Sequence, residues 1–284
     1  MLTRKMTSLL TSALFSSLLL IEGVAYSKPA ITQSGTIKMA GGTAHIAFMQ
    51  DIGAKISQQN PDFTLLVAGG GSGVGVQKLG SGLVDLANTG RPLSVEEKSR
   101  YKLASHALAY DAITFIVNPE NPVSNLSFSD LQKIFSGEIQ SWEKWTKIPN
   151  QPIHVYVRDE SSGTQDIFVE RVLKNKKIAR FANFTNSQGA MKLAISNDKN
   201  GIGFVGFGYL DNTVKDVRLN GHKASAVSIR STNPKKRYPL VRKLYVNSAQ
   251  KPSPLVHEFL VYLQGPESAE IIKKWGLVPI YKKK

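Results

Sequence analysis

Short apolar runs alternate with longer amphipathic segments along most of this chain. The run GTIKMAGG at 35–42 is typical of a strand followed by a turn. Apolar residues from Ala44 to Ile56 then recur at helical spacing. This predicted helix ends before Pro61, because a proline disfavours helical geometry in the residue that precedes it. The same succession of strand, turn and helix recurs downstream, which predicts an α/β fold.

Later segments repeat this plan with different degrees of burial. The stretch FTLLVAGGGSGVGVQKLGSG at 63–82 is predicted to form a strand, a Gly-rich turn and a short helix, and LVDLANTG at 83–90 another strand. The run AITFIVN at 112–118 is almost wholly apolar, which is typical of a strand buried on both faces. A single final helix is expected over about 254–275.

The first residues have the pattern of an export signal. Arg4 and Lys5 precede an apolar run from Leu9 to Ile21, and small residues follow around Ala25. The apolar run is too short to span a bilayer comfortably. Residues 1–27 are therefore predicted to be a signal peptide cut near Ser27, and the mature chain is expected to be periplasmic or secreted.

Charge and cysteine content narrow the choice of partners. The chain has 36 basic and 21 acidic residues, a formal charge of +15, and losing two basic and one acidic residue with the signal leaves +14. This balance favours anionic partners, although no nucleic-acid-binding motif is found and the export signal argues against nucleic acid. The chain has no cysteine, which excludes disulfides, thiolate metal sites and a lipid anchor on an N-terminal Cys. The basic clusters are 174–180, 235–237 and 282–284.

Three turns rich in Gly, Ser and Thr precede predicted helices: GGTA at 41–44, GGGSG at 69–73 and SSGT at 161–164. Each alone is explained as an ordinary helix cap, worth about 1 kcal/mol. Ligands of α/β proteins gather where strands end, however, and a helix start offers free N–H donors and a positive dipole end to an anion. Three such turns together favour an oxyanion site.

The motif RDESSGTQDIF at 158–168 places an arginine and two carboxylates beside the third turn. The planar guanidinium of Arg158 suits an oxyanion, because it can donate two parallel hydrogen bonds. Asp159 and Glu160 are adjacent and so are not expected to face one point as an acid and base pair. Glu160 is better placed to orient Arg158.

The sequence lacks the motifs of nucleotide-binding sites, serine hydrolases and zinc sites. The lysine of GVGVQKLGSG does not match the Walker pattern, and 69–75 lacks the dinucleotide spacing. Neither Ser72 nor Ser162 lies in the Gly-x-Ser-x-Gly pattern of α/β hydrolases. The 5 histidines form no pattern typical of a base or a zinc site, and His45, which follows the first turn, is expected to be a helix residue without a special role. No enzyme activity, metal or cofactor is predicted.

Taken in order, the motifs resemble those of the exported phosphate-binding proteins that supply phosphate ABC transporters. The resemblance covers nearly the whole mature chain and rests on six segments: GGTA, 69–94, LQKIFSGEIQSW (131–142), RDESSGTQDIF, GIGFVGF (201–207) and YPLVRKLYV (238–246). It implies the type II periplasmic-binding-protein fold, in which two α/β lobes joined by crossover strands close on the ligand. The implied lobes are 28–112 with 240–284, and 113–239.

The resemblance also implies the binding residues. From the first lobe, they are Thr43, Ala44 and Ser72; from the second, they are Arg158, Ser162, Gly163 and Thr164. Gly90, Arg91 and Glu160 are possible supporting residues, with Glu160 steadying Arg158. Well-known members of the family have an aspartate at the position of Gly90 in this chain. That aspartate accepts the proton of hydrogen phosphate and repels sulfate.

The implied partners are inorganic phosphate and the membrane permease of a phosphate ABC transporter, and a monomer is expected. Three alternatives stay open at this point. One is a carrier of sulfate, molybdate or arsenate. Another is a basic secreted protein that binds cell-surface polymers. The third is an enzyme such as a phosphatase, for which no nucleophile, base or metal cluster is evident.

Overall fold

The computed structural model describes residues 31–280. The predicted signal peptide and the basic cluster at 282–284 therefore lie outside the described residues. Within residues 31–280, no helix is both long and apolar enough to cross a membrane.

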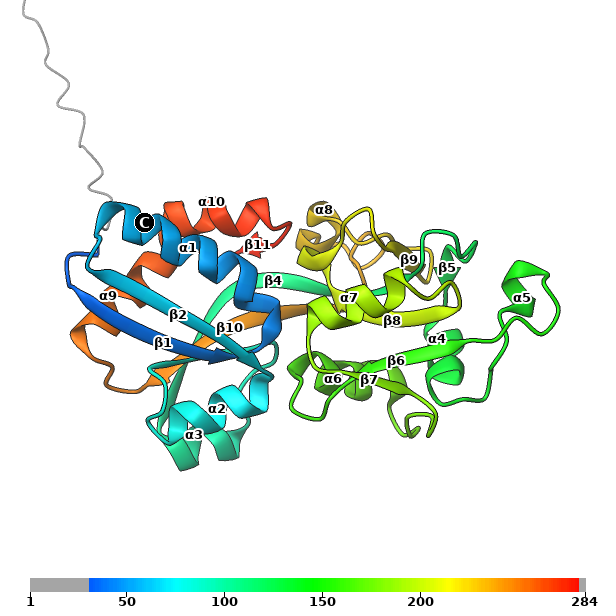
Figure 1. Cartoon of the computed structure of the whole chain (residues 1–284), viewed down its shortest axis with the longest axis horizontal. Helices are drawn as coiled ribbons and strands as arrows, with labels where there is room; N and C mark the ends of the chain where they lie inside the picture. The colour runs from blue at the N-terminus through cyan, green and yellow to red at the C-terminus, as the bar shows by residue number, and fades with distance from the viewer. Residues whose placement is uncertain (1–30, 281–284) are drawn as a thin grey trace, which may run out of the picture.

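Two long strands connect the two lobes of the molecule (Figure 1). Strand β4 (Leu103–Val117) has 15 residues. Its first part, up to Ala112, pairs with the antiparallel strand β10 (Val241–Ala249), and its last part, from Ile113, pairs with β8 and β9. One strand therefore serves the sheet of both lobes.

All strands of the described chain belong to one continuous, strongly curved arrangement of 11 strands. Its main order is β2-β1-β3-β10-β4-β8-β6-β7, and β5, β9 and β11 lie off this path. β1 is parallel to both β2 and β3, as expected for strands connected through helices. The remaining strands are β1 (Gly35–Gly41), β2 (Phe63–Gly70), β3 (Leu86–Thr89), β5 (Asn125–Leu126), β6 (His154–Arg158), β7 (Asn183–Thr185), β8 (Gly201–Gly206), β9 (Lys215–Leu219) and β11 (Val278–Pro279).

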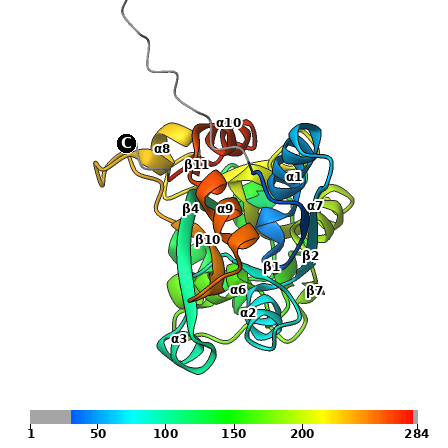
Figure 2. The same ribbon diagram turned by 90° about the vertical axis from the view of Figure 1, so that its left-hand side faces the viewer.

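Helices cover the strands on both faces (Figures 1 and 2). Adjacent residues of a strand point to opposite faces, and in β3 Leu86 belongs to the core under α1, whereas Ala87 belongs to a smaller cluster with α2. The helices are α1 (Ile46–Gln59), α2 (Ser72–Gly80), α3 (Val95–Tyr101), α4 (Phe128–Phe135), α5 (Glu143–Thr146), α6 (Gly163–Phe168), α7 (Gln188–Ser196), α8 (Ala226–Arg230), α9 (Pro254–Leu263) and α10 (Pro266–Lys274). Shorter turns are η1 (Thr43–His45), the π-helical η2 (Val169–Leu173) and η3 (Phe207–Tyr209).

Each lobe has its own hydrophobic core. One core gathers residues of β1, β2, α1, α9 and α10, including Ile52 and Phe259. The other surrounds an aromatic cluster in which Phe168 stacks on Phe204 with ring centroids 4.4 Å apart, and Phe115 meets Phe204 edge-on at 6.2 Å. The two cores are separate clusters, and the second also includes Val241 and Val278 of the C-terminal segment.

One prediction about the elements is wrong, and another is correct but incomplete. The final helix is two helices, because Pro266 cannot donate the backbone hydrogen bond that would continue α9, and α10 begins at that proline. The strand expected at 112–118 is the last part of a longer one that begins at Leu103. Its upstream half was missed because LASHALAYD mixes polar and small residues instead of forming an apolar run.

Replacing Phe204 with Ala is expected to lower the free energy of unfolding by about 3–5 kcal/mol, because the side chain is fully buried and the cavity left behind cannot collapse completely. Phe184→Ala is the matched control, since that ring is 66% exposed and its loss is expected to change stability by about 0.5 kcal/mol or less. Urea denaturation measures both, and equal losses would contradict this description of the core.

Candidate anion-binding site

The three turns of the sequence analysis meet in one small cavity. All residues implied as phosphate ligands line it, together with Gly90. The lining residues are Gly42, Thr43, Ala44, Gly71, Ser72, Gly90, Arg158, Ser162, Gly163 and Thr164. The structure therefore brings together segments more than 100 residues apart in the chain, as the pattern of strand ends predicted.

Three helix starts place polar groups in the lining of this cavity. Thr43 begins η1 directly after β1, and Ser72 begins α2 directly after the turn that follows β2. Ser162 caps α6, where its hydroxyl accepts a hydrogen bond from the backbone N–H of Gln165 at 3.4 Å. Helix starts have backbone N–H groups without an intrahelical acceptor and carry the positive end of the helix dipole. The cavity is therefore rich in hydrogen-bond donors.

Arg158 is the last residue of β6 and is 2% exposed. Its Nε donates to the carbonyl of Thr185 at 3.1 Å, and its Nη2 donates to the carbonyl of Asn186 at 3.1 Å. These two bonds fix the guanidinium plane, and Nη1 has no acceptor among the described residues. Burial lowers the pKa of Arg158 and the nearby charge of Arg242 acts in the same direction, whereas Asp159 opposes both effects. An anion would relieve this cost of burial.

The sequence analysis expected Glu160 to contact Arg158. The carboxylate beside Arg158 is instead that of Asp159. Asp159 Oδ2 lies 3.4 Å from Nη2 of Arg158, whereas Glu160 is exposed and has no hydrogen bond or ion pair with residues 31–280. The strand direction explains the difference, because Asp159 follows directly on the last residue of β6 while Glu160 lies in the turn that leaves it.

A second buried arginine contacts the lining of the cavity, and the sequence analysis missed it. Arg242 of β10 donates from Nη1 to the hydroxyl of Thr164 at 2.7 Å. Its Nε and Nη2 donate to Oδ2 of Asp111 on β4 at 2.9 and 2.8 Å, and both side chains are 1% exposed. The signal in the sequence was a charged residue at the centre of the apolar strand PLVRKLYV. This signal alone could not predict a buried arginine, because the carboxylate that compensates its charge, that of Asp111, lies 131 residues away in the chain.

Arg242 also explains the glycine at position 90. A Cβ atom built on Gly90 would lie 2.7 Å from Nη1 of Arg242, so a side chain here requires the guanidinium to move. Instead, the backbone N–H of Gly90 donates to the hydroxyl of Ser72 at 3.0 Å. In this chain a cation lies next to the position where the resemblance led us to expect a carboxylate.

The hydroxyl of Thr164 is oriented by its neighbours. It accepts from Arg242 and also from Nε2 of Gln188 at 3.1 Å. The Gln188 amide is fixed in this orientation, because its oxygen accepts from the backbone N–H of Gly206 at 2.9 Å. With both lone pairs of Thr164 Oγ1 occupied, its proton remains to be donated into the cavity.

Contacts across the cleft hold the two lobes together in the present arrangement. Ser161 Oγ donates to the carbonyl of Gly70 at 2.7 Å, and the backbone N–H of Gly73 donates to the carbonyl of Ser161 at 3.0 Å. A Cβ on Gly163 would lie 2.3 Å from Ser72 Oγ, so glycine is required for this close approach. The lobes are therefore closed over the cavity.

Arg91 clamps the closed lobes and does not line the anion cavity. Its Nε lies 2.7 Å from Asp166 of α6, and its Nη1 and Nη2 bind the carboxylate of Glu97 at 2.7 and 2.8 Å. The bidentate bond to Arg91 is the main reason that the pKa of Glu97 is lowered. Arg91, named above as a possible supporting residue, therefore joins the two sides of the cleft and lies outside the cavity lining.

His45 lies beneath the cavity and is completely buried. Burial, and then the charge of Arg242, lower its pKa from 6.5 to about 3. Its Nδ1 lies 3.2 Å from the carbonyl of Gly42, so the neutral ring carries its proton on Nδ1. His45 is therefore neutral and buried at the end of η1.

This fold and cavity define a two-lobed α/β binding-protein architecture, with a polar site enclosed between the lobes. Residues 27–267 match a family model described as the PBP superfamily domain, and the chain therefore belongs to this superfamily. These findings confirm the family resemblance and the two-lobed fold predicted from the sequence motifs.

Several individual proteins are similar over most of their length. The phosphate-binding protein PstS of Bacillus subtilis is 28% identical over 252 residues, which cover 87% of this chain and 81% of that protein. An ABC-type phosphate transport receptor from Vibrio cholerae has a TM-score of 0.68 at 28% identity, covering 85% of this chain and 99% of that one. A Clostridium perfringens protein solved with bound phosphate shares the fold, with a TM-score of 0.80 at 24% identity over 87% of this chain and 100% of that one.

Stability is expected to fall as the pH drops below 6.5, because His45 is neutral in the folded protein and binds a proton readily only when unfolded. Its contribution is fully present above pH 6.5 and decreases towards its folded pKa of about 3, by up to about 1.4 kcal/mol per pH unit. His45→Phe is expected to flatten the dependence of the free energy of unfolding on pH between pH 6.5 and 4.5. Urea denaturation tests this, with exposed His257→Gln as the control; a slope unchanged by His45→Phe would contradict it.

Proposed function

We propose that this chain is an exported solute-binding protein that captures inorganic phosphate between its two lobes and delivers it to an ABC importer. The observation that carries the proposal is the enclosed cavity, in which hydroxyls, helix starts and the buried guanidinium of Arg158 converge, with Arg242 hydrogen-bonded to Thr164 of the lining. No Asp or Glu of residues 31–280 lines it. The names of the Bacillus subtilis and Vibrio cholerae relatives support phosphate as the ligand.

The proposed ligands come from both sides of the cleft. Thr43, the N–H of Ala44 and Ser72 bind the anion from one side, and Arg158, Ser162, Gly163 and Thr164 from the other. We add Arg242, through its Nη1 group, to the ligands that the sequence resemblance implied. Because the anion contacts both sides only when they are closed, its binding stabilises the closed form, which a membrane permease would recognise.

The charge of the cavity favours a doubly charged anion. Arg158 and several donor hydroxyls line it, the charge of Arg242 lies next to Thr164 and Gly90 of the lining, and Gly90 provides no carboxylate to accept a proton from the ligand. The dianionic form of phosphate therefore fits better than the singly charged form. Sulfate is similar in shape and also doubly charged, and no negative group in the lining repels it, so it is expected to compete with phosphate.

The remaining parts of the proposal concern the whole molecule. We place the lobe boundaries at 112/113 and 239/240, supported by the change of partner along β4 at Ile113 and by the start of β10 at Val241. The mature chain acts as a periplasmic or secreted monomer without enzymatic activity. The basic composition fits a protein that collects anions.

Arg158→Ala is expected to leave the fold intact and to weaken phosphate binding by about 2–5 kcal/mol, because a buried charged contact with the anion is lost. Isothermal titration calorimetry with phosphate measures the change. Arg218→Ala removes an exposed arginine outside the cavity and is the control, for which affinity is expected to stay the same. Wild-type affinity in Arg158→Ala would remove Arg158 from the site.

The role of Arg242 is tested by a charge-neutral pair of substitutions. Arg242→Gln alone leaves Asp111 buried without its partner and is expected to destabilise the fold by about 3–5 kcal/mol. The double variant Arg242→Gln, Asp111→Asn removes both charges, so it is expected to fold normally and to bind phosphate about tenfold or more weakly, the loss of one charged hydrogen bond. Calorimetry on a folded double variant that binds like the wild type would show that Arg242 does not contact the anion.

A further inference from the structure

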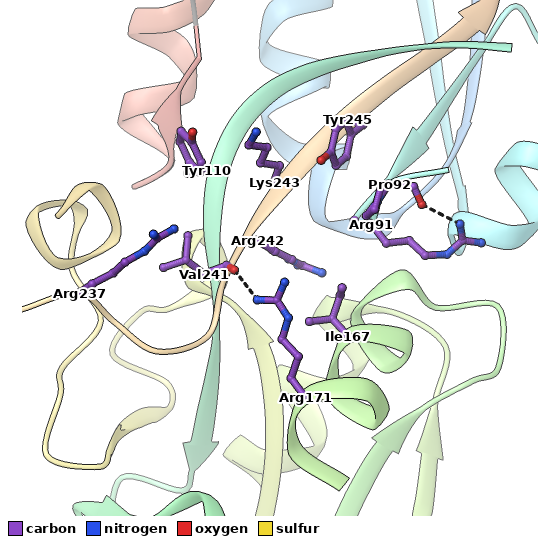
Figure 3. Close-up of a pocket in the computed structure, with 11 residues that line it drawn as sticks. Arg91, Pro92, Tyr110, Ile167, Arg171, Arg237, Val241, Arg242, Lys243 and Tyr245 are labelled. Carbon is purple, nitrogen blue, oxygen red and sulfur yellow. Dashed lines mark hydrogen bonds between the residues drawn. The ribbon is translucent and has the colours of Figure 1, made fainter. Parts of the chain in front are cut away.

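A second hollow lies beside the anion cavity, along β10 where it passes between the lobes (Figure 3). Its volume is about 290 Å³. It shares Gly90 with the cavity, and it is also lined by Arg242, which donates a hydrogen bond to Thr164 of the cavity lining. Another hollow of about 380 Å³ continues from it and shares Arg171, Arg237 and Val241. We call these two continuous hollows the basic groove.

Cations dominate the lining of the basic groove. They are Arg91, Arg171, Arg237, Arg242 and Lys243, and no Asp or Glu of residues 31–280 lines either hollow. Two of these charges are compensated, since Arg91 is paired with Glu97 and Asp166, and Arg242 with Asp111. The other three have no ion pair among the described residues.

Local contacts hold two of the three uncompensated cations. Nη1 of Arg171 donates to the carbonyl of Val241 at 2.9 Å, which holds the guanidinium against the strand. Nζ of Lys243 lies 5.6 Å from the centre of the Tyr110 ring. Arg237 extends from the loop that leads into β10 and is exposed (Figure 3). Like charges gathered in a groove without acidic neighbours repel one another and concentrate anions from solution.

We propose that the basic groove is a second binding site, for a soluble oligophosphate, an anion with two or more linked phosphoryl groups. The two hollows join at Arg171, Arg237 and Val241, and the three uncompensated cations line this joined space. A chain of phosphoryl groups presents oxygens to several of these cations at once, whereas a single phosphate engages only part of the groove. Arg171 and Arg237 line both hollows and would contact such a ligand at its middle.

Lys235 and Lys236 are exposed on the loop beside Arg237 and extend the positive field beyond the groove. The basic cluster at 235–237, which phosphate capture in the cavity does not use, thereby obtains a role.

The groove is lined from both sides of the cleft. Lys243 and Tyr245 belong to β10 where it pairs with β3 and β4, whereas Ile167 and Arg171 belong to α6 and η2. An anion in the groove would therefore contact the same two bodies as the anion in the cavity, although through different residues.

The test is a calorimetric titration of the exported chain with tripolyphosphate, in the presence of enough phosphate to fill the cavity. One-to-one binding is expected, and it should weaken as salt concentration rises. The triple variant Arg171→Gln, Arg237→Gln, Lys243→Gln is expected to bind tripolyphosphate at least about tenfold more weakly, because three charged contacts are lost. Its affinity for phosphate alone should change less than about twofold, since none of the three side chains lines the cavity.

The control variant Lys55→Gln, Lys223→Gln, Lys251→Gln removes the same charge from exposed lysines that have no ion pair among residues 31–280. It is expected to bind tripolyphosphate like the wild type. Equal weakening in the two triple variants, or no binding of tripolyphosphate at all, would overturn the proposal. So would simple competition between tripolyphosphate and phosphate, which would place both ligands in the cavity. A second titration with tripolyphosphate, in the absence of phosphate, compares the wild type with the triple variant even if the protein does not bind phosphate.

Discussion

The buried ion pair between Arg242 and Asp111 is the interaction on which the rest of the site depends. It connects the two strands that cross between the lobes, and it extends to Thr164 at the anion cavity. Burying two charges is costly unless their geometry and remaining hydrogen bonds are satisfied. Here Asp111 also accepts from the backbone N–H of Phe207 at 2.9 Å, which adds the end of β8 to the same network. One hydrogen-bond network therefore joins the two crossing strands to Thr164 in the wall of the cavity.

The same pair accounts for the composition of the cavity. With Nη1 of Arg242 close to Gly90, a side chain at this position is excluded unless the guanidinium moves. The cavity is lined by hydroxyls, N–H groups and Arg158, and Arg242 is hydrogen-bonded to Thr164 of this lining. No carboxylate of residues 31–280 is among the lining residues. Under the proposed function, selection between anions depends on charge and size, and not on the repulsive acceptor that the family resemblance led us to expect. The small residue at position 90 leaves the space that the guanidinium of Arg242 occupies.

Much of the fold and part of the site could be predicted from the sequence, because they depend on local signals. Gly, Ser and Thr before an amphipathic helix mark a turn in any context, and Arg158 lies directly beside such a turn. Asp111 and Arg242 carry no such mark. Asp111 is the only acidic residue of β4, but it lies in a segment without a clear apolar pattern, and its partner is distant in the chain. The Asp159 contact was also missed, because the direction in which β6 ends decides which of two adjacent carboxylates meets Arg158.

The most direct test of the account is calorimetry of the anion-free mature protein with phosphate and with sulfate, at pH 5.5 and pH 8. The central claim is that two buried arginines hold a doubly charged anion without help from a carboxylate. The account predicts one-to-one phosphate binding that is tighter at pH 8, where more of the phosphate is doubly charged, together with competition by sulfate at both pH values. Phosphate binding that is absent, or that is tighter at pH 5.5 with sulfate excluded, would contradict it.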